Sequence, residues 1–94
     1  MLTVTTPALL RLAKRLARSG AGREVTLRFT RREGGWKLQP GEERANDVSF
    51  AHDGRSVLVL DEPVAKAMAD MTLDVEHTGA GPRLRLRRAK GRRQ

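Results

Sequence analysis

The sequence has 94 residues, a formal net charge of +8 and no cysteine. This length suits one domain with a modest core, and the lack of cysteine excludes disulfides, zinc-thiolate sites and cysteine nucleophiles. The longest clear apolar run, Val57 to Leu60, is far shorter than the roughly 20 residues that cross a membrane, so we expect no membrane association and a cytoplasmic protein. Residues 1–23 are basic and helical in pattern, and the less favoured alternative is a mitochondrial transit peptide.

The N-terminal part predicts a strand, a helix and a second strand. A short strand at residues 2–4 precedes a helix with Thr6 as its N-cap and Pro7 in its first position, and Gly20 ends this helix. Leucines repeat on one helical face and basic residues on the opposite one. Alternation from Val25 to Phe29 then predicts a half-buried strand. The basic helical face consists of Arg11, Lys14, Arg15 and Arg18.

The second half of the chain predicts further strands and one short helix. A short strand around Trp36 leads into a polar loop at residues 40–46. A hairpin follows, whose turn at Asp53-Gly54 suits positive φ. Asp61 then caps a short helix, and a last hairpin joins residues 72–76 to 83–87.

These elements predict a mainly β, α+β domain. We expect a twisted sandwich or pseudo-barrel of about seven short strands, with one N-terminal helix and one short helix. Residues 1–88 should form this single domain. Residues 89–94 are polar and basic, which is typical of a disordered tail.

Several motifs occur in a recognisable order. These are Asp47-Val48-Ser49-Phe50, then Asp53-Gly54, Val57 and Val59 before Asp61, and finally Leu73-Asp74-Val75. In order and spacing the chain resembles the HesB/IscA-like A-type iron–sulfur carriers over about residues 2–87. The resemblance implies a HesB-like fold.

The same resemblance exposes a difference in chemistry. Family members hold a cluster or iron through three thiolates, one in a Gly-Cys-small-Gly loop and two in a Cys-Gly-Cys near the C-terminus. This chain has Arg32 to Trp36 in place of the first motif and Arg87 to Gln94 in place of the second. We therefore expect a divergent member without cluster ligands and without a cofactor.

Catalytic and metal sites are not indicated. His52 and His77 each lie at or beside a predicted turn, and with nearby carboxylates they do not supply the three or four matched ligands that a metal site usually needs. The serines lack a strand-turn-helix elbow, and the paired acids would diverge in space. We expect no enzymatic activity, no catalytic residue and no metal site.

Charge is the remaining signal. Residues 33–82 are net acidic, whereas both flanking segments are strongly basic. Alternation places Arg83, Arg85 and Arg87 on one face of a strand, with Leu84 and Leu86 on the other. This basic stripe is a candidate polyanion site, although an arginine-rich composition would also produce it on a solvated surface. It comprises Arg83, Arg85, Arg87, Arg88, Lys90, Arg92 and Arg93.

Two functions remain. The leading hypothesis is a non-enzymatic binding or adaptor protein on a HesB-like scaffold, linked to iron–sulfur assembly through a protein partner; a homodimer is also expected from the resemblance. Gly34, Gly35 and Trp36 are the candidate partner surface, although core packing or anchoring of the loop is the favoured role for Trp36. The alternative is a small basic protein that binds nucleic acid.

Overall fold

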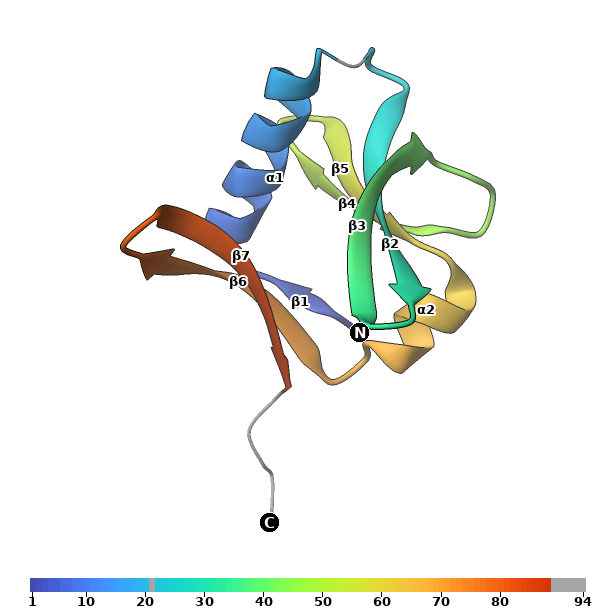
Figure 1. Cartoon of the computed structure of the whole chain (residues 1–94). Coiled ribbons are helices and arrows are strands. Elements are labelled where there is room, and N and C mark those ends of the chain that lie inside the picture. The colour runs from blue at the N-terminus through green and yellow to red at the C-terminus, as the bar shows by residue number, and fades with distance from the viewer. Residues whose placement is uncertain (21, 89–94) are drawn as a thin grey trace.

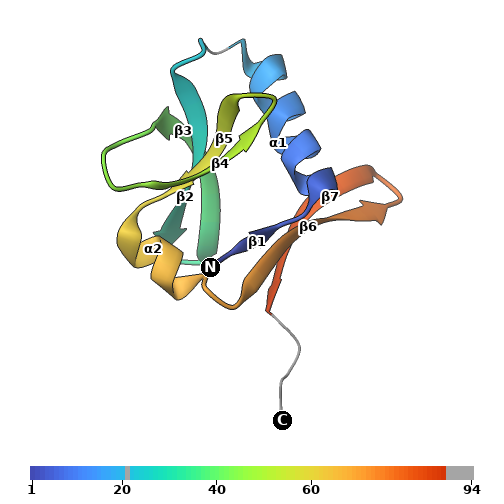
Figure 2. The same cartoon turned by 180° about the vertical axis from the view of Figure 1, so that it is seen from behind.

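A computed structural model describes residues 1–20 and 22–88, which form seven strands and two helices (Figures 1 and 2). The expected mainly β, α+β architecture is confirmed. In chain order the elements are β1 (Thr3–Val4), α1 (Thr6–Ser19), β2 (Val25–Arg32), β3 (Gly35–Glu42), β4 (Val48–His52), β5 (Arg55–Leu60), α2 (Glu62–Ala67), β6 (Met71–Thr78) and β7 (Gly81–Arg88).

The strands form two mixed sheets. One has the order β1-β6-β7, and the other has the order β3-β2-β5-β4. Within them β1 runs parallel to β6 and β2 runs parallel to β5, whereas the other pairs are antiparallel. Helix α1 packs against strands of both sheets (Figure 1), and its Leu12 and Leu16 join the common core. The largest of the fully buried side chains are Leu12, Leu16, Val57, Leu58, Val59, Leu60, Met68 and Leu73.

Helix α1 begins one residue earlier than the sequence indicates. Its N-cap is Thr5, whose hydroxyl accepts a hydrogen bond from the backbone N–H of Ala8, and Thr6 and Pro7 fill the first turn. The same hydroxyl donates to Asp74 on β6 at 2.8 Å, which ties the start of the helix to the first sheet. At the other end Gly20 adopts the expected left-handed conformation with φ of 71°.

Strand β2 is buried on both faces, so the expectation of a half-buried strand is wrong. Leu27 and Phe29 face the core as predicted, but Thr26 and Arg28 on the other side are also buried. The segment between β3 and β4 covers that side, where Asp47 forms an ion pair with Arg28. A charged residue can be buried there only because this carboxylate compensates it.

The hairpins follow the sequence more closely. Strand β3 extends to Glu42 and takes in the first residues of the predicted polar loop. Both turn residues between β4 and β5 have positive φ, 53° for Asp53 and 77° for Gly54, as the hairpin signal predicted. Asp61 caps α2 by accepting a hydrogen bond from Val64. No helix in the described residues is long and apolar enough to cross a membrane.

Candidate binding site between the helix and the two sheets

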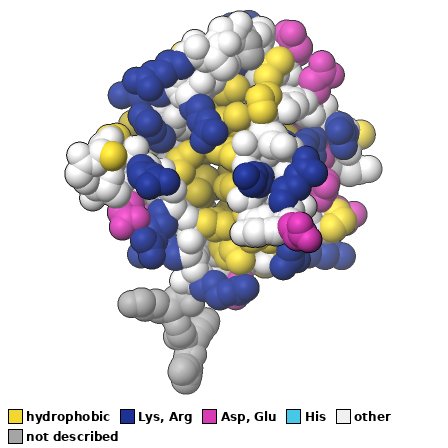
Figure 3. All heavy atoms as spheres, viewed as in Figure 1, with side chains coloured by type: hydrophobic (Ala, Val, Ile, Leu, Met, Phe, Trp, Pro, Cys, Tyr) yellow, Lys and Arg dark blue, Asp and Glu magenta, His cyan; other side chains and the backbone are white. Residues whose placement is uncertain are grey.

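An apolar hollow of about 280 Å³ opens where the two sheets face each other, and we name it the inter-sheet groove. Figure 3 shows hydrophobic side chains in a central hollow of this face, with Lys and Arg side chains around it. The groove exists because Leu84 and Leu86 of β7 point towards the second sheet while their arginine neighbours point to solvent. It is lined by Arg15, Phe29, Trp36, Leu38, Leu73, Leu84 and Leu86.

Trp36 contributes one wall of the inter-sheet groove. Its indole is partly buried against the core, and the Arg31 guanidinium lies 4.9 Å from the ring centroid, within the range of a cation–π interaction. Gly34 lies in the exposed turn before it, and the exposed Gly35 begins β3 with φ of 121°. Of the three residues predicted as a partner surface, only Trp36 lines the groove.

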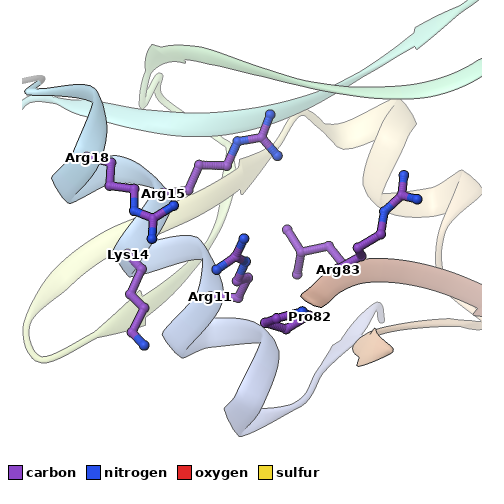
Figure 4. A pocket seen from close by; sticks show the side chains of 7 residues that line it. Arg11, Lys14, Arg15, Arg18, Pro82 and Arg83 are labelled. Carbon is purple, nitrogen blue, oxygen red and sulfur yellow. The ribbon is translucent and has the colours of Figure 1, made fainter. Parts of the chain in front are cut away.

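A second hollow, of about 400 Å³, adjoins the groove and shares Arg15 and Leu84 with it. We name it the basic cavity. Helix α1 supplies one side and the start of β7 the other, although these segments are far apart in the sequence (Figure 4). Among residues 1–20 and 22–88 its lining contains five cations and no acidic residue: Arg11, Lys14, Arg15, Arg18 and Arg83, with Pro82 and Leu84.

Three of the four arginines of β7 form ion pairs with carboxylates. Nη1 of Arg85 donates to Glu76 at 2.8 Å, and Nη2 of Arg87 donates to Asp74 at 3.1 Å. Arg88 lies 3.4 Å from the Asp70 carboxylate. Asp74 and Glu76 of β6, with Asp70 just before it, thus compensate part of the basic stripe, which the sequence did not reveal because these acids lie outside β7. Lys90, Arg92 and Arg93 lie outside the described residues.

Hydrogen bonds made by the paired residues shift the pKa of Asp74 and of Arg85. The Thr5 hydroxyl and the Val75 N–H donate to Asp74, and together with Arg87 they hold the pKa of this carboxyl below its usual value, although burial opposes them. The hydrogen bond and the charge of Glu76 raise the pKa of Arg85. Asp74 is therefore ionised at neutral pH and connects α1, β6 and β7.

The described residues offer no site for a metal or an iron–sulfur cluster. They contain no group of three His, Asp or Glu side chains placed to hold a metal ion, and no cysteine occurs anywhere in the sequence. His52 lies beside the turn residue Asp53, with Nε2 3.4 Å from the carboxylate, and His77 is exposed near the end of β6. This donor set does not fit a cluster, which needs thiolate ligands.

Comparison with solved structures finds proteins of similar fold. The crystal structure of Escherichia coli SufA, involved in the biosynthesis of iron–sulfur clusters, matches with a TM-score of 0.66 and 23% identity over 93% of this chain and 84% of SufA. The structure of IscA with the 2Fe–2S cluster matches with a TM-score of 0.64 and 15% identity over 94% of this chain and 85% of IscA. No family model and no curated protein matches the sequence.

These comparisons show the fold of the chain. This chain has the architecture of the A-type iron–sulfur carriers, as the resemblance in its motifs predicted, and it has no cysteine. SufA and IscA resemble it in structure across almost its whole length.

The sequence identified the basic face of the helix and the basic stripe of the last strand, but it did not show that the two lie beside each other in the fold. Arg11, Arg15 and Arg18 were visible as one face of a helix, and Arg83 as part of a stripe. Only the packing of β7 beside α1 brings them to one cavity (Figure 4). Such a contact between segments about 70 residues apart leaves no local sequence pattern.

Proposed function

We propose that this protein is a non-enzymatic binding protein that uses the carrier-like scaffold without a cluster and engages a protein partner through the inter-sheet groove. The observation that carries the proposal is the mainly apolar lining of this groove. The chain has no cysteine, so it has no thiolate ligand for a cluster, whereas the groove offers a surface that can bind another protein. Trp36 and the leucines of β7 supply the contact area, since aromatic and aliphatic anchors dominate binding energy.

Charge around the groove selects the partner's chemistry. Arg15 lines the groove itself, and Arg31 stacks on the outer wall at Trp36. Cations beside an apolar floor complement a segment in which apolar side chains alternate with carboxylates. We therefore assign the groove to an acidic, apolar segment of another protein. A link to iron–sulfur assembly rests on SufA, a structural neighbour involved in that biosynthesis.

The test uses a photo-crosslinking amino acid at position 36, with the same group at position 66 on the exposed surface of α2 as control. Crosslinks should form from position 36 alone, and the captured segment should be acidic and apolar. A synthetic peptide of that segment should then change the emission of Trp36, which is the only tryptophan in the chain. The signal should saturate as the peptide fills the groove.

Variants locate the binding. Leu86→Glu places a carboxylate in the groove and should abolish peptide binding, whereas Lys66→Glu should leave it unchanged. Circular dichroism shows whether both variants fold. If Leu86→Glu does not fold, Leu86→Ala replaces it in the binding test. Equal crosslinking from both positions, crosslinking to a second copy of this chain, or binding insensitive to Leu86 would each overturn the proposal.

A further inference from the structure

The basic cavity carries an inference that goes beyond partner binding. Five cations line one hollow of about 400 Å³, and no acidic residue among those described belongs to this lining. In Figure 4 the side chains of Arg11 and Arg15 extend from α1 on the side nearer Pro82 and Arg83, Arg18 lies further along the helix, and Lys14 points away from Arg11 and Arg15. Within the described part of the chain, none of these five cations makes an ion pair.

Arg83 differs from the other arginines of β7, because each of the others forms an ion pair with a carboxylate. In the hairpin Glu76 lies directly opposite Arg83, yet its carboxylate accepts from Arg85 on the diagonal. Asp74 in turn lies opposite Arg85 and pairs with Arg87. The pairing is displaced by two residues along the strand, so the one arginine left over is the one that lines the basic cavity.

Folding does not explain this concentration of charge. On α1 the four cations are spaced three or four residues apart, where like charges destabilise a helix. Only Arg18 lies in the last turn, where the helix dipole favours a cation. A bound anion would compensate the repulsion that the protein's own carboxylates leave in place.

The shape and chemistry of the hollow select the class of anion. Its volume falls within the range of small-ligand sites, so it fits a compact molecule. Guanidinium groups bind phosphate oxygens in a bidentate manner, and those of four arginines line this hollow. A single carboxylate would leave most of the positive charge uncompensated. We propose that the basic cavity binds a small ligand carrying two or more linked phosphate groups.

Calorimetric titration of the full chain with inorganic tripolyphosphate tests this proposal, and a nucleoside triphosphate titrated in parallel tells whether an organic group adds affinity. Arg83→Gln should weaken tripolyphosphate binding about tenfold, the effect of losing one charge-assisted contact. The matched control is Arg88→Gln, on the same strand but paired with Asp70, and it should change affinity less than about twofold. Arg11→Gln tests the helical side and should match Arg83→Gln.

Three results would overturn the proposal. One is the absence of tripolyphosphate binding at low salt. The second is equal weakening by Arg83→Gln and Arg88→Gln, which would show diffuse attraction in place of a site. The third is tighter binding of duplex DNA than of tripolyphosphate, with Arg88 contributing as much as Arg83, since the surface would then follow a nucleic-acid backbone. Thermal unfolding of each variant excludes loss of the fold.

Discussion

The buried ion pair between Arg28 and Asp47 fastens the segment between β3 and β4 to β2, and its disruption tests our account of this strand. The two side chains are only 8% and 3% exposed. Arg28 also donates to the Glu42 carbonyl at 2.9 Å, and Asp47 accepts from the Arg44 N–H at 2.7 Å. Nε and Nη1 of Arg28 are buried without a hydrogen-bond partner among the described residues. The guanidinium therefore depends on Asp47 for compensation.

Removing the carboxylate should be costly. Loss of one partner from a buried ion pair destabilises a protein by about 3–5 kcal/mol, and we expect Asp47→Ala to lie near the lower end because the adjoining segment can open to water. The matched control is Glu76→Ala, which breaks a pair whose side chains are 57% and 46% exposed and should cost less than about 1 kcal/mol. Urea unfolding of both variants measures the difference. Equal costs would refute the argument.

The same pair predicts how stability depends on pH. Burial would raise the pKa of Asp47, but hydrogen bonds from Arg28 and from the Arg44 backbone, together with their charges, hold it below the usual value. A carboxyl whose pKa is lowered on folding stabilises the protein above its unfolded pKa of about 3.9, and this contribution is lost as the pH falls through the folded value. Asp47→Ala should thus flatten the loss of stability below about pH 4. If the unfolding free energy of the variant falls below pH 4 as steeply as that of the unmodified protein, this assignment is contradicted.

Further predictions concern the core, the turns and assembly. Leu58→Ala should lower the unfolding free energy by about 3 kcal/mol because Leu58 is fully buried. Gly54→Ala should cost about 1–2 kcal/mol because the turn needs positive φ there, whereas Gly79→Ala, in open space without positive φ, should be nearly neutral. Urea unfolding measures all three, and equal effects of the glycine variants would count against the turn argument. Sedimentation at micromolar concentration tests the predicted homodimer, and a monomer throughout would exclude it.

The sequence was sufficient where a local pattern determines the structure. Alternating apolar residues located β2, the Asp53-Gly54 pair located the hairpin of β4 and β5, and the basic and apolar faces of residues 6–19 located α1. The order of motifs predicted the carrier-like fold, which the structural neighbours confirm. These features depend on residues close together in the chain.

Contacts between distant segments were not predictable in this way. Arg28 was expected to face solvent, but Asp47 covers and compensates it from another element. The basic stripe was predicted from alternation alone, but Asp74 and Glu76 of β6, with Asp70 just before this strand, place three carboxylates beside it. Arg83 escapes that compensation only because the pairing runs diagonally across the hairpin. The candidate site thus depends on register and packing, which alternation alone does not specify.

Anaerobic reconstitution tests the central claim most directly, namely that a carrier-like scaffold here functions without a cluster. The protein is incubated with iron and sulfide, desalted and assayed for both elements and for visible absorption, with E. coli SufA treated in parallel. Because the chain has no thiolate, we predict a colourless protein without stoichiometric iron or sulfide. Retention of both elements in stoichiometric amounts, with the absorption of a cluster, would contradict the account.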